Sequence, residues 1–350
     1  MGDGTKESPL TRKDILKLRK ENGKTAKGLD LSGKIFEDGI NLGKLDLRGI
    51  ILRDTTLKGA HLEGAMLAGT HLEGAYLSNA HLEGANLSVA HLEGAYLYDA
   101  HLEGADLNGV HLEGASLPRA HLEGAWLLGA HLKGADLVSA HLEGADLSDA
   151  HFEGAYLIGA HLEGAYLSLA EFSPDTKLEY ADWGNYIVGE EEEGDFTIAA
   201  DTYRRLKQWH TTAGMYDRAG EFYYREMTAK RKNYWWQGIQ SKSFQKLLYG
   251  AWSKFLSVLC GYGERPLRVV ISALVVVLGS ALIYFAIGTL TPNTFPNSLY
   301  YSAVSFTALG YGRWAPEPTG WVKGLGAAEA FAGVFMMALF LITFTRKMTR

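Results

Sequence analysis

The sequence predicts a multidomain fold: a β-solenoid, followed by an α-helical connector and an all-α membrane domain with two spans and a re-entrant loop. A five-residue period runs through the first half of the 350-residue chain, helical periodicity follows it, and two long, almost uncharged runs lie within residues 266–350. Because one domain typically has ~100 to 200 residues, several are expected. We assign an N-terminal helix or cap to residues 1–28, the solenoid to 29–185, a helical hairpin to 186–233, an interfacial amphipathic helix to 234–265 and the membrane domain to 266–350.

The five-residue period is the strongest signal in the chain. Leu or Phe recurs at every fifth position from Leu42 to Phe172, usually two residues after Ala. H-L-E-G-A recurs every ten residues from His61, with Lys133 and Phe152 as the exceptions. An α-helix would spread this period around its surface and a flat strand would alternate by two, so neither accounts for it. A solenoid does, because stacked coils repeat the same inward position. The amphipathic residues 10–20 are expected to cover its first coil as a short helix.

The repeat unit resembles the pentapeptide-repeat family, whose unit is A-(D/N)-L-x-x, over about residues 29–185. The resemblance implies a right-handed quadrilateral β-helix with one unit per side, in which the Leu and the preceding Ala point inward. The 27 units between residues 40 and 174 would then form nearly seven coils. At about 4.8 Å per coil the rod would be on the order of 35 Å long.

Eleven of the twelve histidines lie in the repeats, directly before the inward Leu. They are therefore expected to point outward in two columns on opposite faces. Metal binding is conceivable there, but a surface ladder copied with the repeat unit is favoured, and no metal site is assigned. Residues 60–170 hold 15 acidic residues against Arg119 and Lys133, a net charge of −13. Such a rod repels phosphate groups, so nucleic-acid binding is disfavoured.

Apolar residues at helical spacing in residues 196–232, interrupted at 211–214, predict a helical hairpin. One hairpin cannot bury its apolar face alone, so it is expected to dock on the solenoid or on a neighbouring subunit. The predicted face of its second helix consists of Ala219, Phe222, Tyr223 and Met227.

Two charged stretches flank the hairpin. The acidic run at residues 190–193 lacks the ligand spacing of a calcium site, so a solvated loop with helix N-terminal charge is favoured. Residues 228–268 hold eight Lys or Arg and only Glu264 as an acid, interleaved with Trp, Leu and Phe. This pattern predicts an amphipathic helix on the anionic inner leaflet of a membrane, and the apolar run that follows disfavours a nucleic-acid site.

Two apolar runs are long enough to cross a bilayer, which takes about 20 residues. Residues 269–290 carry no charge, and residues 325–345 carry only Glu329. Eight basic residues precede the first run and three follow the second, whereas two lie between them. This asymmetry predicts a multi-pass protein of the cell membrane with both termini cytoplasmic. The N-terminus shows no apolar segment of the signal-peptide type, and Cys260 is a single cysteine, in agreement with this.

A further apolar run, residues 299–309, lies between the spans in a segment too short for a domain. Pro296, Asn297 and Ser298 supply the chemistry of a helix start. The run continues into G-Y-G at residues 310–312. A short helix directed into the membrane, followed by glycines that let backbone carbonyls face an axis, is the geometry of a cation filter.

This segment, S-F-T-A-L-G-Y-G, resembles the filter of two-span pore-loop potassium channels, usually T-V-G-Y-G after a Thr, and the similarity covers about residues 266–349. The resemblance implies a homotetramer around one axis, without a cofactor, that conducts K⁺, with Na⁺ as the alternative ion. Gly333 would match the gating hinge of the inner helix, and Glu329 would lie behind the filter. The filter carbonyls would come from Ala308, Leu309, Gly310, Tyr311 and Gly312, with Thr307 just below them.

Two departures from that pattern bear on ion selectivity. Ala308 stands where the family usually has Thr, so the hydroxyl of the innermost ion site is missing. Arg313 stands where Asp is usual, which places four positive charges near the outer mouth of a tetramer and disfavours cation entry unless the side chains turn outward.

The sequence thus predicts a tetrameric potassium-selective channel, a passive conductor and not an enzyme, whose cytoplasmic β-helices regulate or scaffold the pore. No catalytic residue is assigned, and no metal is expected beyond the permeating cation. One alternative is a non-selective cation channel, favoured by Ala308 and Arg313. The other is a membrane-anchored β-helix scaffold that binds a cytoplasmic protein without conducting ions, since some pentapeptide proteins resemble DNA and bind type II topoisomerases.

Overall fold

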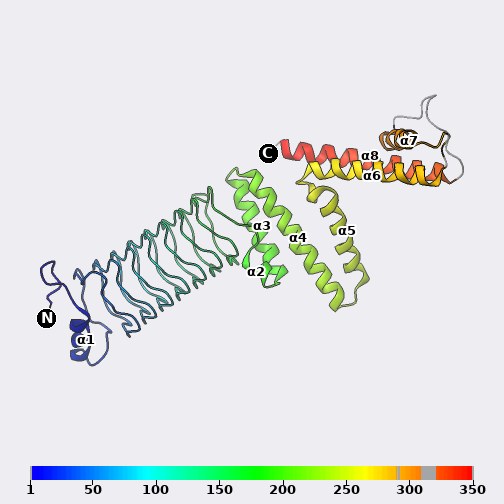
Figure 1. The fold of residues 1–350 in the computed structure, drawn as a ribbon. Coiled ribbons are helices and arrows are strands. Elements are labelled where there is room, and N and C mark those ends of the chain that lie inside the picture. The colour runs from blue at the N-terminus through cyan, green and yellow to red at the C-terminus, as the bar shows by residue number, and fades with distance from the viewer. Residues whose placement is uncertain (1, 289, 291, 309–320, 349–350) are drawn as a thin grey trace. The chain divides into compact units, whose positions relative to one another are not determined.

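The computed structural model describes residues 2–288, 290, 292–308 and 321–348. The chain divides into two compact units, Met1–Ala229 and Lys230–Arg350. Figure 1 shows the elements in chain order, with α1 at the N-terminal end of a β-helix and helices α2 to α8 after it. Each unit has a buried core of its own.

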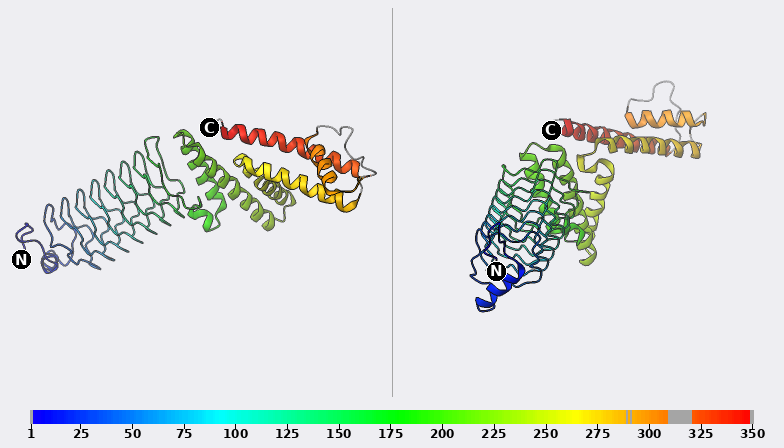
Figure 2. Two further views of the ribbon diagram at one scale, coloured as in Figure 1. Left: turned by 45° about the horizontal axis from the view of Figure 1, so that its top comes forward. Right: turned by 60° about the vertical axis from the view of Figure 1, so that its left-hand side comes forward.

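The first unit is built from coils of the repeat. Parallel bridges join residues 20 apart at every fifth position from Asn41 to Glu171, so each coil has 20 residues and four bridged positions. Main-chain groups pair between coils, as in the bond of 2.7 Å from Leu62 N to His81 O. The stack of coils can be followed in both views of Figure 2. The predicted solenoid is therefore a β-helix with one five-residue unit between successive bridges.

In most units one Leu and one Ala fill the interior of the β-helix, as predicted. Leu102, Ala105 and Leu107, for example, are at most 1% exposed. The chain turns between bridges at a residue with a positive φ angle, such as Gly104 at φ 63. Glycine adopts this conformation without a Cβ clash, which explains the Gly in each H-L-E-G-A unit.

The α1 helix, Arg12–Glu21, overlaps the stretch predicted to cover the first coil. Thr11 and Asp14 form a capping box at its start, which satisfies backbone donors that the first helical turn leaves unpaired. Leu10 and Ile15 are 3% and 1% exposed and belong to the same core as the interior of the β-helix. The helix thus shields the apolar end of the solenoid.

The connector contains the predicted hairpin. The α2 helix spans Gly189–Glu192, α3 spans Phe196–Thr212, and α4 spans Tyr216–Gln240, which carries it from the first unit into the second. Tyr203, Leu206 and Phe222 join the core of the β-helix, so the hairpin docks on the solenoid. Its buried face differs slightly from the predicted one, because Ala219, Phe222, Glu226 and Ala229 are buried whereas Tyr223 and Met227 are half-buried.

The acidic run supplies the charge of the first turn of α2, as predicted, and Glu192 and Glu193 are exposed. The expectation of a solvated loop was wrong for its first two acids. Glu190 and Glu191 lie in α2 and are 5% and 4% exposed. The Glu190 carboxylate accepts hydrogen bonds from Leu167 N and Thr202 Oγ1, and Glu191 accepts one of 2.5 Å from the Tyr203 hydroxyl. Burial raises the pKa of Glu190. These acids tie α2 and α3 to the last coils, a role that composition alone did not indicate.

The second unit departs from the predicted single amphipathic helix at 234–265. The α4 helix ends at Gln240, and α5 spans Phe244–Cys260, followed by the short η1 at Gly261–Gly263. The break falls on Ser-Lys-Ser, where Lys242 has a φ of 50° and the Ser243 side chain caps α5. Polar capping residues at the break therefore override the continuous amphipathic pattern. An apolar face of α5 is exposed, including Leu248, Trp252 and Phe255.

Three helices form the predicted membrane domain. The α6 helix spans Pro266–Ile287, α7 spans Phe295–Thr307, and α8 spans Val322–Met348. Both α6 and α8 contain segments long and apolar enough to cross a membrane, and each begins three residues before the predicted run. The two lie side by side, with α7 packed against both (Figures 1 and 2). The order of a long, a short and a long helix is the predicted one.

Candidate permeation site

The α7 helix leads directly to the predicted filter. It begins at Phe295, just before the predicted start at residues 296–298, because Thr294 is its N-cap and accepts a hydrogen bond from Asn297 N. Pro296 lies in the first turn, where a missing N–H costs nothing. The helix ends at Thr307, and Ala308 follows in the left-handed conformation at φ 53. The chain thus leaves the helix at the first residue of the predicted filter.

The described residues include only the base of that filter. Thr307 and Ala308 are both exposed, and the Thr307 hydroxyl donates to the Ala303 carbonyl oxygen at 2.8 Å. The other predicted filter and mouth residues lie outside the described residues; they are Leu309, Gly310, Tyr311, Gly312 and Arg313. Their roles stay predictions.

Glu329 lies on α8 and is 4% exposed. Its carboxyl group accepts a hydrogen bond of 2.9 Å from the Tyr284 hydroxyl of α6 and a second one from the Ser302 hydroxyl of α7. The one acid in the apolar run of α8 therefore contacts both other helices of the domain. Sequence reasoning missed Ser302 and Tyr284, although a hydroxyl within each apolar helix is a signal for such a buried polar partner.

Gly333 lies on α8 directly against the end of α7. A Cβ atom at this position would overlap the carbonyl oxygen of Phe306 and lie 2.6 Å from its carbonyl carbon. The neighbouring atoms belong to backbone, which cannot move aside as a flexible side chain can. The gating hinge predicted for Gly333 stays a prediction, and its close contact with α7 is a separate property.

The repeat histidines form two columns, as predicted. Ring centroids of successive histidines in a column lie 4.7–5.2 Å apart. In most units Nδ1 faces the carboxylate of the Glu two residues later, at 2.9 Å for His61 and Glu63. The spacing of the rings follows from the stacking of the coils.

These columns do not make a convincing metal site. His61, Glu63 and His81 place three donor atoms within 4.8 Å of one another, and other coils repeat the set. Zinc–nitrogen bonds are only ~2.0–2.1 Å long, so the stacked rings would have to abandon the spacing that the coils impose. His111 and His121 each belong to two neighbouring sets. A surface ladder remains the favoured interpretation.

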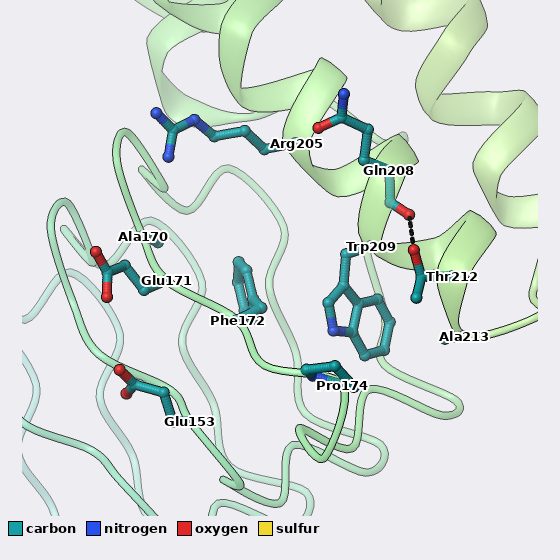
Figure 3. A pocket seen from close by; sticks show the side chains of 10 residues that line it. All are labelled: Glu153, Ala170, Glu171, Phe172, Pro174, Arg205, Gln208, Trp209, Thr212 and Ala213. Carbon is teal, nitrogen blue, oxygen red and sulfur yellow. Dashed lines mark hydrogen bonds between the residues drawn. The ribbon is translucent and has the colours of Figure 1, made fainter.

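A cavity of about 460 Å³ lies where α3 meets the last coil (Figure 3). Phe172, Pro174 and Trp209 form its apolar side, and Trp209 Nε1 donates to the Ser173 carbonyl oxygen at 2.9 Å. On its polar side Arg205 forms an ion pair with Asp201, with 2.9 Å between Nε and the carboxylate oxygen. The cavity is thus a seam beside a docked helix, and its exposed polar side chains single out no ligand.

His210, on α3, is fully buried among Trp183, Trp209 and Phe222. Its Nδ1 contacts the Leu206 carbonyl oxygen at 2.8 Å. Burial lowers the pKa of His210 to about 4, and the charge of Arg218 adds to the effect. This histidine is therefore neutral in the folded connector at neutral pH.

We predict that His210 makes the connector sensitive to acid. Because its folded pKa lies below the unfolded value of ~6.5, unfolding takes up a proton and the free energy of unfolding falls as the pH drops from about 6.5 towards 4. Between pH 7 and pH 4.5 this residue should account for a loss of roughly 2 to 3 kcal/mol. Denaturant unfolding of the detergent-solubilised protein measures it. His210→Phe should remove that part of the pH dependence, whereas His101→Asn, in one of the surface columns, should keep it. Equal pH dependence in wild type and His210→Phe would contradict the prediction.

Two family models match the chain. A model of pentapeptide repeats matches eight copies between residues 38 and 173, and a model described as an ion channel matches residues 272–350. No curated protein matches the chain significantly. The second model covers α7, α8 and most of α6, together with the segment 309–320.

Several solved structures are similar to the β-helix. HetL, a pentapeptide repeat protein involved in heterocyst differentiation regulation from the cyanobacterium Nostoc sp. strain PCC 7120, is 28% identical over 49% of this chain and 94% of its own, with a TM-score of 0.19. QnrB1, a plasmid-mediated fluoroquinolone resistance protein, is 18% identical over 46% of this chain and 84% of its own, with a TM-score of 0.33. A pentapeptide repeat protein of the Arabidopsis thaliana thylakoid lumen is 29% identical over 41% of this chain and 70% of its own, with a TM-score of 0.17.

Proposed function

The chain is a membrane protein that joins pentapeptide repeats to an ion channel domain, and we propose that it forms a tetrameric, potassium-selective pore. The observation that carries this proposal is the course of the chain around α7. A short helix between two spanning helices ends at Thr307, and A-L-G-Y-G follows directly. Carbonyl oxygens of such a stretch, contributed by several subunits around an axis, replace the hydration shell of K⁺.

The arrangement of charge supports an orientation with both termini cytoplasmic. Basic residues are more frequent before residue 269 and after residue 345 than between residues 290 and 325. The exposed apolar face of α5, flanked by Lys246 and Lys254, suits the surface of an anionic inner leaflet. The β-helix would then lie in the cytoplasm, where it regulates the pore, scaffolds it or binds a protein partner.

The matched families are of non-enzymatic kinds, and we propose neither a catalytic residue nor a cofactor. The permeating ion is the only metal that the proposal requires. The acidic surface of the repeats argues against nucleic acid as a partner.

Reversal potentials test the proposal. The purified protein is reconstituted in liposomes with K⁺ inside and Na⁺ outside, and the voltage at zero current is measured. A potential close to the K⁺ equilibrium value is expected. A potential near zero would indicate a non-selective cation channel, the alternative favoured by Ala308 and Arg313. Absence of current at all voltages would favour a membrane-anchored scaffold.

Arg313 provides a second test of the same pore. Arg313→Asp should raise cation conductance severalfold at low salt and have little effect at high salt, because four positive charges at the mouth repel cations. Screening explains the difference, since the Debye length falls from ~30 Å at 0.01 M to ~3 Å at 1 M. Single-channel conductance at both salt concentrations measures it. Unchanged conductance at low salt would place Arg313 away from the permeation path.

A further inference from the structure

The α7 and α8 helices touch at two levels, one turn apart. Glu329 and Gly333 are four residues apart on α8, and Ser302 and Phe306 are four residues apart on α7, so each pair shares one helix face. Glu329 bonds Ser302, and Gly333 faces the carbonyl of Phe306. The two contacts form a continuous seam along the second half of α7, which ends at the residue after Phe306.

The contact between Glu329 and Ser302, called the upper contact below, is polar and extends to α6. The Ser302 hydroxyl lies 2.8 Å from the Val277 carbonyl oxygen as well as beside Glu329. Ser302 and Tyr284 are both fully buried. A polar group buried in an apolar environment destabilises the folded state when its hydrogen-bond partner is removed, so this network holds α7 in one register against both spanning helices.

The contact between Gly333 and Phe306, called the lower contact below, depends on the absence of a side chain at Gly333. Gly333 lies inside a regular helix, so it is needed there for space and not for backbone conformation. Gly324 on α8 and Gly279 on α6 differ, since a Cβ at either position would have no neighbour within 4 Å. Among these three glycines, only Gly333 sets how closely two helices approach.

We infer that Glu329 and Gly333 are positioning residues that place the end of α7 and thereby the base of the filter. This inference rests on the proposed pore. It adds that ion selectivity depends on residues that do not line the filter. Displacing Phe306 displaces Thr307, its neighbour in the chain, and selectivity depends on how the coordinating groups are held. Gly333 acts here as a contact surface, independently of any bending of α8.

Matched glycine variants test the lower contact. Gly333→Ala should lower the ratio of K⁺ to Na⁺ permeability by about tenfold or more, whereas Gly324→Ala in the same helix should leave it within about twofold. Reversal potentials in liposomes give both ratios. If Gly333→Ala keeps the wild-type ratio, or changes only the open probability as a hinge residue would, the inference is wrong.

The upper contact is tested by rescue with an isosteric group. Glu329→Ala should reduce the permeability ratio as Gly333→Ala does, because two buried hydroxyls lose a partner. Glu329→Gln should restore it, since the amide can bond both hydroxyls. Equal ratios in Glu329→Ala and wild type would overturn the inference, as would failure of the glutamine to restore the ratio.

The same variants separate the inference from the proposed function. If the wild-type protein conducts no ions, the proposed pore fails. The contact itself is then judged by thermal unfolding of the detergent-solubilised protein, in which Gly333→Ala should unfold at a lower temperature than Gly324→Ala. Equal unfolding temperatures in that case would overturn the contact too.

Discussion

Gly310→Ala is expected to abolish selective potassium flux while the protein still inserts and assembles. The G-Y-G sequence follows α7 after Ala308 and Leu309, and a filter made of backbone carbonyls needs successive residues whose carbonyls face one axis. Glycine reaches the left-handed conformations that such a stretch uses without steric cost, whereas alanine has a Cβ atom that opposes them by about 1 to 2 kcal/mol per residue. Because every subunit carries the substitution, each one loses a carbonyl ligand of the same ion site on the axis.

Gly288 offers a matched control for that experiment. It terminates α6 with a φ of 67°, so Gly288→Ala introduces backbone strain of the same kind at a position outside the predicted filter. We expect Gly288→Ala to lower stability modestly and to keep the wild-type reversal potential. Undiminished and equally selective flux in Gly310→Ala would remove this segment from the pore.

Leu102→Asp is expected to unfold the middle of the β-helix or to prevent expression. Leu102 is 1% exposed, and its neighbours in the stack, Leu82 and Leu122, are equally buried. A carboxylate among them has no cation to pair with, and burying an unpaired charge costs several kcal/mol, a large part of the ~5 to 15 kcal/mol that stabilises a typical domain. Because each coil contacts only its neighbours, the damage should spread to the coils on both sides.

The adjacent residue supplies the control for Leu102→Asp. The Glu103 side chain is 37% exposed and faces His101, so Glu103→Lys should change the free energy of unfolding by less than about 1 kcal/mol. Circular dichroism with thermal unfolding of both purified variants measures the difference. Similar stability of the two variants would refute the assignment of inward and outward positions.

The architecture follows from repetition and hydropathy, both of which are visible in one dimension. A five-residue period with constant Leu and Ala admits few folds, since only stacked coils bury the same position again and again. The spans and α7 were predictable because a membrane accepts only long apolar helices whose backbone groups are paired internally. The base of the candidate filter was predictable for the same reason, because α7 has recognisable start signals and an apolar length that ends near Thr307.

Tertiary structure alone decided features that depend on which partner a side chain meets. The run at 190–193 looks solvated in composition, yet Glu190 and Glu191 are buried because backbone and hydroxyl donors of the last coils and α3 reach them. Gly333 is one of several glycines in an apolar helix, and only the approach of Phe306 distinguishes it from Gly324. Periodicity determines which elements form and which face each one buries, because these depend on neighbours in the chain. The contacts of a single buried acid or glycine depend on residues distant in sequence, and no local pattern encodes them.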